Sequence, residues 1–235
     1  MDKLVKQKFN IFLLIDVSRS MCGSRITQVN QAIKDIAISL KEMQEDNTSV
    51  DFYISILTFG TTANWHNNKK ETYIDDFDFK DIKASGQSNL HLAYKELNEV
   101  LKKKTQGGMM PDYGGVAPII ILLSDGHPSK GNIKDELASL KNKPWFKVAL
   151  KYGIAVELND KKTLNVLKDF VSNNGDVIQV YNANLLKRII KVIVLTASKV
   201  KSTSTSIHNH KYVNVSEEIR QEINETLNSI NDWEW

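Results

Sequence analysis

The chain has 235 residues, a formal net charge of +3, 41% hydrophobic residues and 25% charged residues. This length and composition suit one α/β domain with an extension, and so small a net charge does not favour nucleic acid as a partner. No apolar stretch approaches the roughly 18 residues that span a bilayer, so we expect no membrane segment. The first ten residues carry lysines without a long apolar segment behind them, so we expect no secretory signal.

The chain contains one cysteine, Cys22, so a disulfide within the chain is excluded and a reducing compartment is compatible with the sequence. Its position close to polar residues 16–20 suggests two interpretations, a redox-active thiol or a small residue in a tight loop. We favour the second, because reactivity requires a lowered thiol pKa, which a sequence does not reveal.

The first strand and helix are predicted on either side of a short polar loop. The segment from Phe9 to Ile15 is almost continuously apolar, as in a strand buried on both faces of a parallel sheet. The pentapeptide DVSRS, from Asp16 to Ser20, follows directly. From Ser24 onward, apolar residues recur at offsets of three and four on one helix face, at Ile26, Val29, Ile33, Ile36, Leu40 and Met43.

The next unit repeats the order of strand, polar loop and helix. Residues 52–59, FYISILTF, predict a second strand, and residues 71–77 a short edge strand. A helical stripe begins at Leu90, immediately after the loop that contains Ser88. Serine at this position is explained either as a helix cap or as a ligand that faces a site, and both interpretations stay open here.

A glycine-rich stretch, residues 105–117, is unusually long for a connection between a helix and a strand. It leads into a buried strand at residues 119–123, which is followed by Asp125 in the sequence SDG. In an α/β unit the helix returns to the amino ends of the strands. We therefore expect this stretch to be a variable surface loop on the face opposite Asp16 and Asp125, and not a lid over them.

The remaining pattern predicts three helices, two strands and a tail: helices at 133–140, 164–171 and 185–193, a strand within 147–156 and one at 177–180. We assign residues 1–200 to one domain, 201–214 to a polar linker and 215–235 to an amphipathic C-terminal helix that ends with Trp233 and Trp235. This helix could bind a groove on another protein or pack on its own domain. The fold class is α/β: a Rossmann-like, doubly wound, mostly parallel sheet flanked by helices, with a C-terminal helical extension.

Three polar segments follow predicted strands or precede a predicted helix, and each contains short oxygen side chains. Because the carboxyl ends of parallel strands converge at one edge of a sheet, we expect these oxygens to meet there. Hard divalent cations prefer such ligands, and Mg²⁺ retains several waters in a weakly charged site. We predict a Mg²⁺ site, with Mn²⁺ or Ca²⁺ as alternatives, formed by Asp16, Ser18, Ser20, Ser88 and Asp125.

These three segments, DVSRS, SGQSNL and LSDG, resemble the metal-ion-dependent adhesion site (MIDAS) of von Willebrand factor type A (vWA) domains. The resemblance covers most of the chain from Phe9 to Lys199. Within this family, the SDGHP form of the third segment is most similar to bacterial tellurium-resistance proteins of the TerY type. The sequence departs from the family in having Ser88 where threonine is usual, and Ser129 and Lys130 where TerY-type proteins often have an acidic residue.

The resemblance implies a non-enzymatic, metal-dependent protein-interaction module, in which Ser18, Ser20 and Ser88 bind the metal directly, and Asp16 and Asp125 largely through water. A partner Asp or Glu would complete the metal shell. The TerY resemblance implies a bacterial cytoplasmic protein that acts with a Ser/Thr kinase and a metal-dependent protein phosphatase. The expected setting is stress response, tellurite resistance or phage defence.

Two other functions were weighed. A Mg²⁺-dependent phosphohydrolase with an aspartate nucleophile has a second acid two residues after the first, but Ser18 occupies that position here. The sequence also lacks a Gly-x-x-x-x-Gly-Lys-Ser/Thr phosphate loop. The other function is a scaffold that binds through its C-terminal helix and retains a vestigial metal site.

Overall fold

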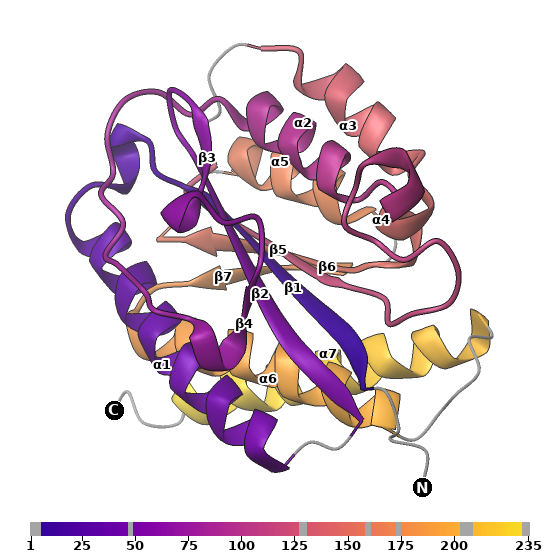
Figure 1. The fold of residues 1–235 in the computed structure, drawn as a ribbon. Helices are drawn as coiled ribbons and strands as arrows, with labels where there is room; N and C mark the ends of the chain where they lie inside the picture. Colours follow the sequence, from indigo (N-terminus) through magenta and orange to yellow (C-terminus); the bar gives the residue numbers. More distant parts are fainter. Residues whose placement is uncertain are drawn as a thin grey trace, which may run out of the picture.

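The computed structural model describes residues 6–46, 49–126, 131–157, 161–172, 175–202 and 209–231 (Figure 1). These residues form a 7-stranded sheet in the order β3-β2-β1-β5-β6-β7, with β4 paired to β2. The strands are β1 (Gln7–Asp16), β2 (Val50–Phe59), β3 (Ala63–Trp65), β4 (Thr72–Tyr73), β5 (Ile119–Ser124), β6 (Leu150–Val156) and β7 (Gly175–Val180).

Helices α1 to α7 connect or follow these strands. They are α1 (Ser24–Asp46), α2 (Leu90–Val100), α3 (Ile133–Lys141), α4 (Pro144–Val148), α5 (Lys161–Val171), α6 (Ala183–Ser202) and α7 (Asn209–Asn231). Four short 3₁₀ helices are η1 (Arg19–Met21), η2 (His66–Asn68), η3 (Ile74–Asp76) and η4 (Lys104–Gln106).

The strand directions confirm the predicted α/β class. β1 lies between β2 and β5 and is parallel to both, and β5, β6 and β7 are also parallel to one another. The short strands β3 and β4 pair antiparallel with β2. The carboxyl ends of the parallel strands therefore lie at one edge of the sheet, which is where Asp16 ends β1.

Helices cover both faces of the sheet (Figure 1). Alternate side chains of β1 point to opposite faces: Leu13 and Ile15 pack in the cluster that includes α1, α6 and α7, while Phe12 and Leu14 pack in the cluster that includes α2 to α5. Because both faces are covered, β1 is apolar throughout its central residues, which is the pattern that made it recognisable in the sequence.

The long strands and helices lie where the sequence predicted them, although α6 and α7 extend beyond their predicted ranges, and the other differences concern short elements. The edge strand predicted at residues 71–77 is limited to β4, and η3 follows it, because the aspartates at 75 and 76 are poor strand residues. β3 and α4 were not anticipated. α4 begins with Pro144, whose fixed φ suits the first turn of a helix, but at five residues it is too short to show a periodic pattern.

The glycine-rich stretch at residues 105–117 leads into the amino end of β5, and Asp125 lies beyond the other end of that strand. It is not a purely superficial loop, because Met110 is fully buried and Met109 packs against the same core cluster. Tyr113 in contrast is 91% exposed. The stretch is therefore anchored through its methionines and presents its glycine-rich part to solvent.

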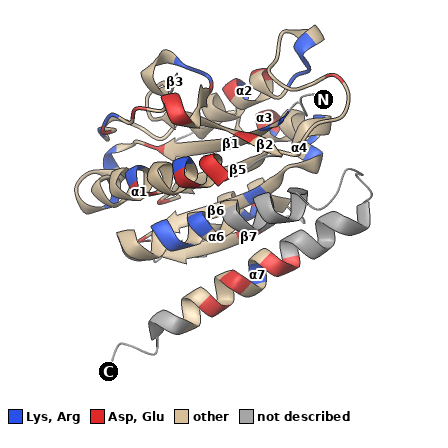
Figure 2. Ribbon diagram, turned by 60° about the horizontal axis from the view of Figure 1, so that its bottom comes forward, with Lys and Arg blue, Asp and Glu red and all other residues tan. Residues whose placement is uncertain are grey.

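α7 packs against its own domain. Ile219 and Ile223 are buried in the core cluster that contains the α6 side chains Leu186 and Ile190. Arg220 on α7 also forms an ion pair with Asp176 on β7, with 3.1 Å between the Nη2 and Oδ1 atoms. Figure 2 shows acidic residues along α7, and four of them are Glu217, Glu218, Glu222 and Glu225.

Helices occupy both ends of the segment predicted as a linker, residues 201–214. α6 extends to Ser202 and α7 begins at Asn209, while residues 203–208 lie outside the described part of the chain, as do the terminal Trp233 and Trp235.

None of the helices in the described part of the chain combines the length and the apolar character that crossing a bilayer requires. This agrees with the absence of a long apolar run in the sequence.

Candidate metal site at the carboxyl edge of the sheet

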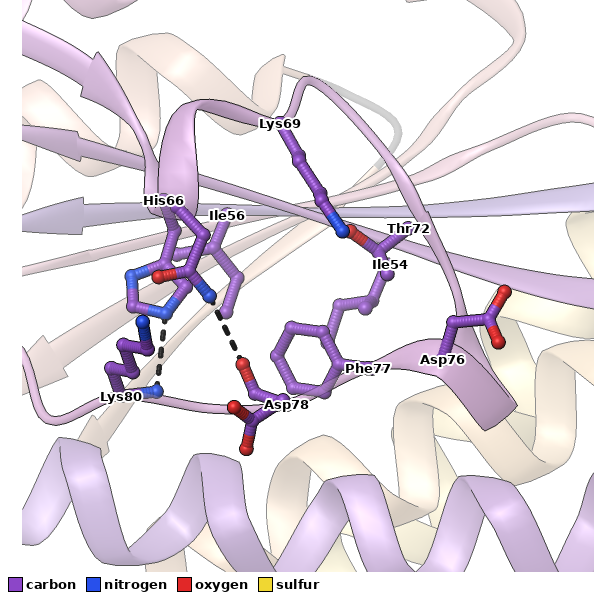
Figure 3. Close-up of a pocket in the computed structure, with 10 residues that line it drawn as sticks. Ile54, Ile56, His66, Lys69, Thr72, Asp76, Phe77, Asp78 and Lys80 are labelled. Carbon is purple, nitrogen blue, oxygen red and sulfur yellow. Dashed lines mark hydrogen bonds between the residues drawn. The ribbon is translucent and has the colours of Figure 1, made fainter.

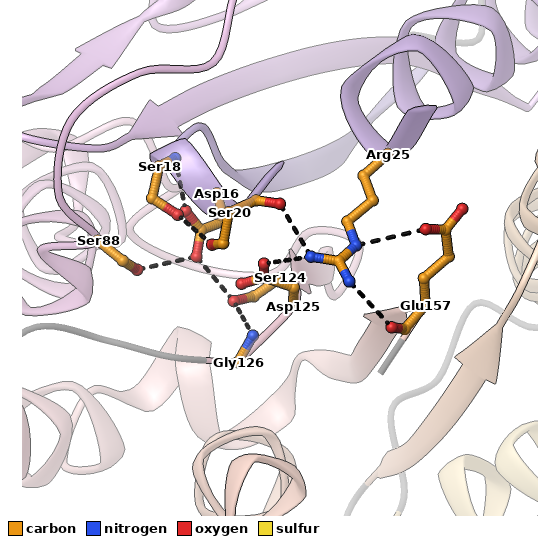
Figure 4. A network of polar contacts seen from close by, with 9 residues as sticks. All are labelled: Asp16, Ser18, Ser20, Arg25, Ser88, Ser124, Asp125, Gly126 and Glu157. Atoms are coloured by element: carbon orange, nitrogen blue, oxygen red, sulfur yellow. Dashed lines mark hydrogen bonds and ion pairs between the residues drawn. The ribbon is translucent and has the colours of Figure 1, made fainter. Parts of the chain in front are cut away.

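Asp16, the last residue of β1, lies at the centre of a polar network (Figure 4). Its side chain is fully buried. The Ser18 N–H donates to Oδ1 over 2.9 Å, and the hydroxyls of Ser88 and Ser124 each donate to Oδ2 over 2.8 Å. Three segments that are distant in the sequence thus meet at one carboxylate.

Burial raises the pKa of the Asp16 carboxyl above its ordinary value, although hydrogen bonds from Ser18, Ser124 and Ser88 lower it in part. The hydroxyl and amide donors do not fully replace the water that the carboxylate loses. A positive charge close to Asp16 would therefore be stabilised, because it would favour the ionised form of the buried group.

The loop that carries Ser18 and Ser20 is fastened to the loop that carries Ser88. The Ser18 and Ser20 hydroxyl oxygens lie 3.1 Å apart, with Ser18 buried and Ser20 exposed. The Arg19 N–H donates to the Gly86 carbonyl over 3.0 Å. Gly86 has a φ of +79°, and a Cβ there would lie 2.2 Å from the Thr61 hydroxyl oxygen, so this loop requires glycine.

Ser88 lies two residues before α2, and Asn89 occupies the N-cap position of that helix. The Ser88 hydroxyl is directed to Asp16 and is buried. Of the two interpretations that the sequence left open, the structure therefore favours a side chain that faces the polar network over one that serves only as the helix cap.

Asp125 follows β5 and is 1% exposed. Its Oδ2 atom accepts a hydrogen bond from Arg25 Nη1 over 3.0 Å. Its Oδ1 atom is buried and has no hydrogen-bond partner among the residues that the structure describes. A buried carboxylate oxygen without a donor is costly, so this atom needs a water or a cation.

The structure thus brings the five predicted ligands into one connected network. Asp16 links directly to Ser18 and Ser88, and Ser18 links to Ser20. Arg25 joins Ser20 to Asp125, because it donates hydrogen bonds to the Ser20 carbonyl and to the Asp125 carboxylate. His127, Pro128, Ser129 and Lys130 lie outside the described residues.

Three participants were not predicted from the sequence: Arg25, Ser124 and Glu157. Ser124 lies within the SDG motif and could have been found there. It donates to Asp16 and accepts the Gly126 N–H over 2.8 Å, so it fixes the turn after β5. Arg25 and Glu157 have no local motif, because the contacts of Arg25 with Asp125 and Glu157 join residues that are 100 and 132 positions apart in the sequence.

The donor set fits a hard divalent cation. It offers hydroxyl and carboxylate oxygens, including the unpartnered Asp125 Oδ1. Among the described residues no group of three or more His, Cys, Asp or Glu side chains gathers as a metal cluster. Ser18, Ser20 and Ser88, together with the two aspartates, are the residues of this network that could hold such a cation.

Cys22 lies close to this network. Its side chain is exposed, and its thiol donates to the Ala84 carbonyl over 3.1 Å. This contact ties the loop after Ser20 to the strand-to-helix segment before Ser88, which supports the interpretation of Cys22 as a small residue in a tight loop.

A separate hollow of about 290 Å³ lies beside β2 (Figure 3). The His66 ring stacks on Phe79 with 5.1 Å between ring centroids, and its Nε2 atom accepts the Lys80 N–H over 3.3 Å. Burial, followed by the charge of Lys80, lowers the pKa of His66. None of the five predicted ligands lines this hollow, whose walls are Ile54, Ile56, His66, Asn67, Lys69, Thr72, Asp76, Phe77, Asp78 and Lys80.

The amino-acid sequence is similar to those of known proteins. A protein-family model described as von Willebrand factor type A domain matches residues 10–192. Inter-alpha-trypsin inhibitor heavy chain H1 of Sus scrofa is 27% identical over 145 residues, which are 59% of this chain and 15% of that protein. Heavy chain H2 of Homo sapiens is 34% identical over 131 residues, or 53% of this chain and 13% of that protein. The chain thus spans a small part of the length of these relatives.

Solved structures show the same fold. The ArnB paralog VWA2 from Sulfolobus acidocaldarius aligns with a TM-score of 0.55 and 18% identity, covering 80% of this chain and 45% of that one. Proximal thread matrix protein 1 from the mussel byssus, in a structure described as having a zinc-occupied MIDAS motif, aligns with a TM-score of 0.57 and 18% identity, covering 82% and 48%. At these identities the likeness concerns the fold.

Proposed function

Because this chain belongs to the von Willebrand factor type A domain family, we propose that it is a divalent-metal-dependent protein-interaction module. The proposed metal ligands are Asp16, Ser18, Ser20, Ser88 and Asp125. The observation that carries the proposal is the buried, unpartnered Oδ1 atom of Asp125 in the same network as the fully buried Asp16. A divalent cation bound among these hydroxyls would compensate the two buried carboxyl groups.

Mg²⁺ is the proposed ion, with Mn²⁺ and Ca²⁺ as alternatives, because all of the side-chain ligands are oxygen atoms. The zinc-occupied MIDAS of the mussel protein supports a divalent ion in a site of this kind. When bound, the ion would act as a Lewis acid that accepts an Asp or Glu carboxylate from a partner protein. The chain's own residues hold the loops together and keep Asp16 and Asp125 away from bulk water.

The network is proposed to serve binding and not catalysis. Ser18 occupies the position at which a phosphohydrolase of the aspartate-nucleophile type has its second acid. Within the described network the acidic groups are engaged by serine hydroxyls or by Arg25, which suits a fixed cradle better than proton transfer.

The cellular role is proposed from the motif alone. The SDGHP sequence supports a TerY-type protein in the bacterial cytoplasm, acting with a Ser/Thr kinase and a protein phosphatase in stress, tellurite-resistance or phage-defence signalling. The alternative of a scaffold that binds through its C-terminal helix is weaker, because Ile219 and Ile223 of α7 are buried against the same domain. We propose no contact with nucleic acid or membrane.

Calorimetric titration with Mg²⁺ and Mn²⁺ tests the metal site. The wild type should bind one divalent ion, and Asp16→Ala should lose this binding while remaining folded. Asp81→Ala is the matched control, since Asp81 pairs with Lys34 on the exposed surface, and should bind as the wild type does. The proposal is wrong if the wild type binds neither ion, or if Asp16→Ala binds them with unchanged affinity.

A further inference from the structure

The Arg25 side chain spans the space between three polar segments (Figure 4). Its Nη1 atom donates to the Ser20 carbonyl over 2.8 Å and to Asp125 Oδ2 over 3.0 Å. Its Nη2 atom donates to the Glu157 carbonyl over 3.3 Å, and its Nε atom lies 3.4 Å from Glu157 Oε2. Because a guanidinium has five N–H donors in a rigid fork, these contacts use most of them. Little of this group remains free to bind a partner's carboxylate.

Glu157 is itself held in place from α1. Its Oε1 atom accepts hydrogen bonds from Gln28 Nε2 over 2.6 Å and from the Ser24 hydroxyl over 3.4 Å. Its φ of 49° lies in the left-handed region, which a residue other than glycine rarely adopts. Such a conformation persists when the surroundings impose it, and here the contacts from Ser24, Arg25 and Gln28 do so.

We propose that Arg25, supported by Glu157, is a positioning residue for the metal site. By holding Asp125 Oδ2, Arg25 turns the other oxygen of the same carboxylate, the unpartnered Oδ1, to a fixed place where a cation can use it. Residues that orient ligands in this way affect metal affinity without contacting the metal. This inference rests on the proposed metal site and adds to it a residue outside the ligand set.

The charge of Arg25 suggests a different role, in which the guanidinium would repel the cation and not position its ligand. Asp16, Asp125 and Glu157 carry three negative charges and Arg25 one positive charge, which leaves −2 for a divalent ion to balance. If Arg25 acted only through its charge, its removal would strengthen cation binding, because a nearby positive charge repels a cation. A positioning role predicts weaker binding after the same change. The direction of the change therefore distinguishes the two.

Calorimetric titration of Arg25 variants with Mn²⁺ provides the test. We expect Arg25→Ala to bind about 10- to 100-fold more weakly than the wild type, the range typical of groups that orient metal ligands. Arg25→Lys should also be weaker, since one ammonium group cannot reproduce contacts to Ser20, Asp125 and Glu157 together. Arg220→Ala is the control: it removes an arginine from an ion pair far from the site and should leave the affinity unchanged.

A double-mutant cycle identifies the route of the effect. If Arg25 acts through Asp125, then Arg25→Ala should change the affinity of an Asp125→Asn protein by less than about twofold. A general loss of structure would weaken both backgrounds equally. Thermal unfolding in EDTA checks that each variant is folded, and Glu157→Gln replaces Arg25→Ala in the test should the latter fail to fold.

The outcomes are distinct. Equal or tighter binding by Arg25→Ala, with metal binding by the wild type intact, overturns the positioning role and leaves the proposed function standing. Failure of the wild type to bind Mn²⁺ overturns both. The positioning role is supported if Arg25→Ala weakens Mn²⁺ binding in the wild-type background but hardly changes the affinity of the Asp125→Asn protein.

Discussion

Two buried ionisable groups lie at opposite edges of the parallel sheet and are treated differently by the fold. Lys151, near the amino end of β6, is 2% exposed, and Asp16, at the carboxyl end of β1, is fully buried. The Lys151 ammonium donates to the carbonyls of Phe146 and Ala149 over 2.9 and 2.8 Å, and lies 4.9 Å from the centre of the Phe146 ring. All of these partners come from the short segment that precedes the strand.

The partners of Asp16 come instead from three segments that are distant in the sequence. The neighbouring Asp125 keeps a buried oxygen for which the described residues offer no donor. An ammonium has three N–H donors, which two carbonyls and an aromatic face can satisfy. The buried lysine is therefore complete within the chain. At the other edge, one buried carboxylate oxygen stays unsatisfied until a cation or water binds. This unsatisfied atom distinguishes a candidate site from a buried charge with a purely structural role.

Among the changes predicted here, truncation of Lys151 should have the largest effect on the free energy of unfolding. Lys151→Ala should lower the free energy of unfolding by about 2–5 kcal/mol, because it leaves a cavity and two buried carbonyls without a donor. Urea denaturation at pH 7 measures the change. Lys134→Ala, on the exposed surface of α3, should change it by less than about 0.5 kcal/mol. A loss of similar size in the two variants would contradict the structural role of Lys151.

The pH dependence of stability provides a second test of the buried Lys151. Burial, followed by the charge of Lys141, lowers the pKa of Lys151 from 10.5 to about 8. Between these values the unfolded chain binds a proton that the folded protein does not, so stability should rise with pH through this window. The gain, on the order of 2–3 kcal/mol, should be present in the wild type and absent in Lys151→Met. Denaturation curves of both proteins at pH 7.5 and 9.5 test this, and parallel behaviour would refute it.

Asp16 should change the pH dependence of stability in the direction opposite to Lys151, and by less. Burial raises the pKa of Asp16 above 3.8. At a pH between 3.8 and this raised pKa, the folded metal-free protein binds a proton that the unfolded chain has released. The contribution of Asp16 to stability therefore decreases as pH rises from 3.8 to the raised pKa. Asp16→Asn should reduce this dependence of stability on pH, because the amide does not titrate. Thermal unfolding in EDTA across acid pH measures it. A steeper slope in the variant would show that burial is not the dominant influence on Asp16.

The strands, the main helices and the five proposed ligands could be located from the sequence because their signals are local. Asp16, Ser18 and Ser20 follow a continuous apolar run, and Asp125 follows another, so the convergence of parallel strands places them together. The spacing of Ile219 and Ile223 likewise predicted a helix. That spacing did not reveal which surface the helix covers, because packing depends on the position of α6 in space.

Arg25 and Glu157 show what local patterns omit. Arg25 appears in the sequence as a single charged residue in the first turns of a helix, and Glu157 as the residue after a strand. Only the arrangement of β1, β5 and β6 side by side brings the arginine to Asp125 and Glu157. Lys151 did carry a sequence signal, since a lysine within an apolar strand must be satisfied in some way. Its partners lie in α4 and at the residue after it, and this helix is too short to be predicted.

The exposed thiol of Cys22 makes the proposed binding edge directly observable. It is the only cysteine of the chain, and it lies two residues after Ser20. A maleimide fluorophore would therefore attach at a single place without any engineered substitution, and its emission would respond to events at the metal-site rim. Quenching upon arrival of a carboxylate-bearing protein would turn a partner search into an optical titration, in which chelation of the metal reverses the signal.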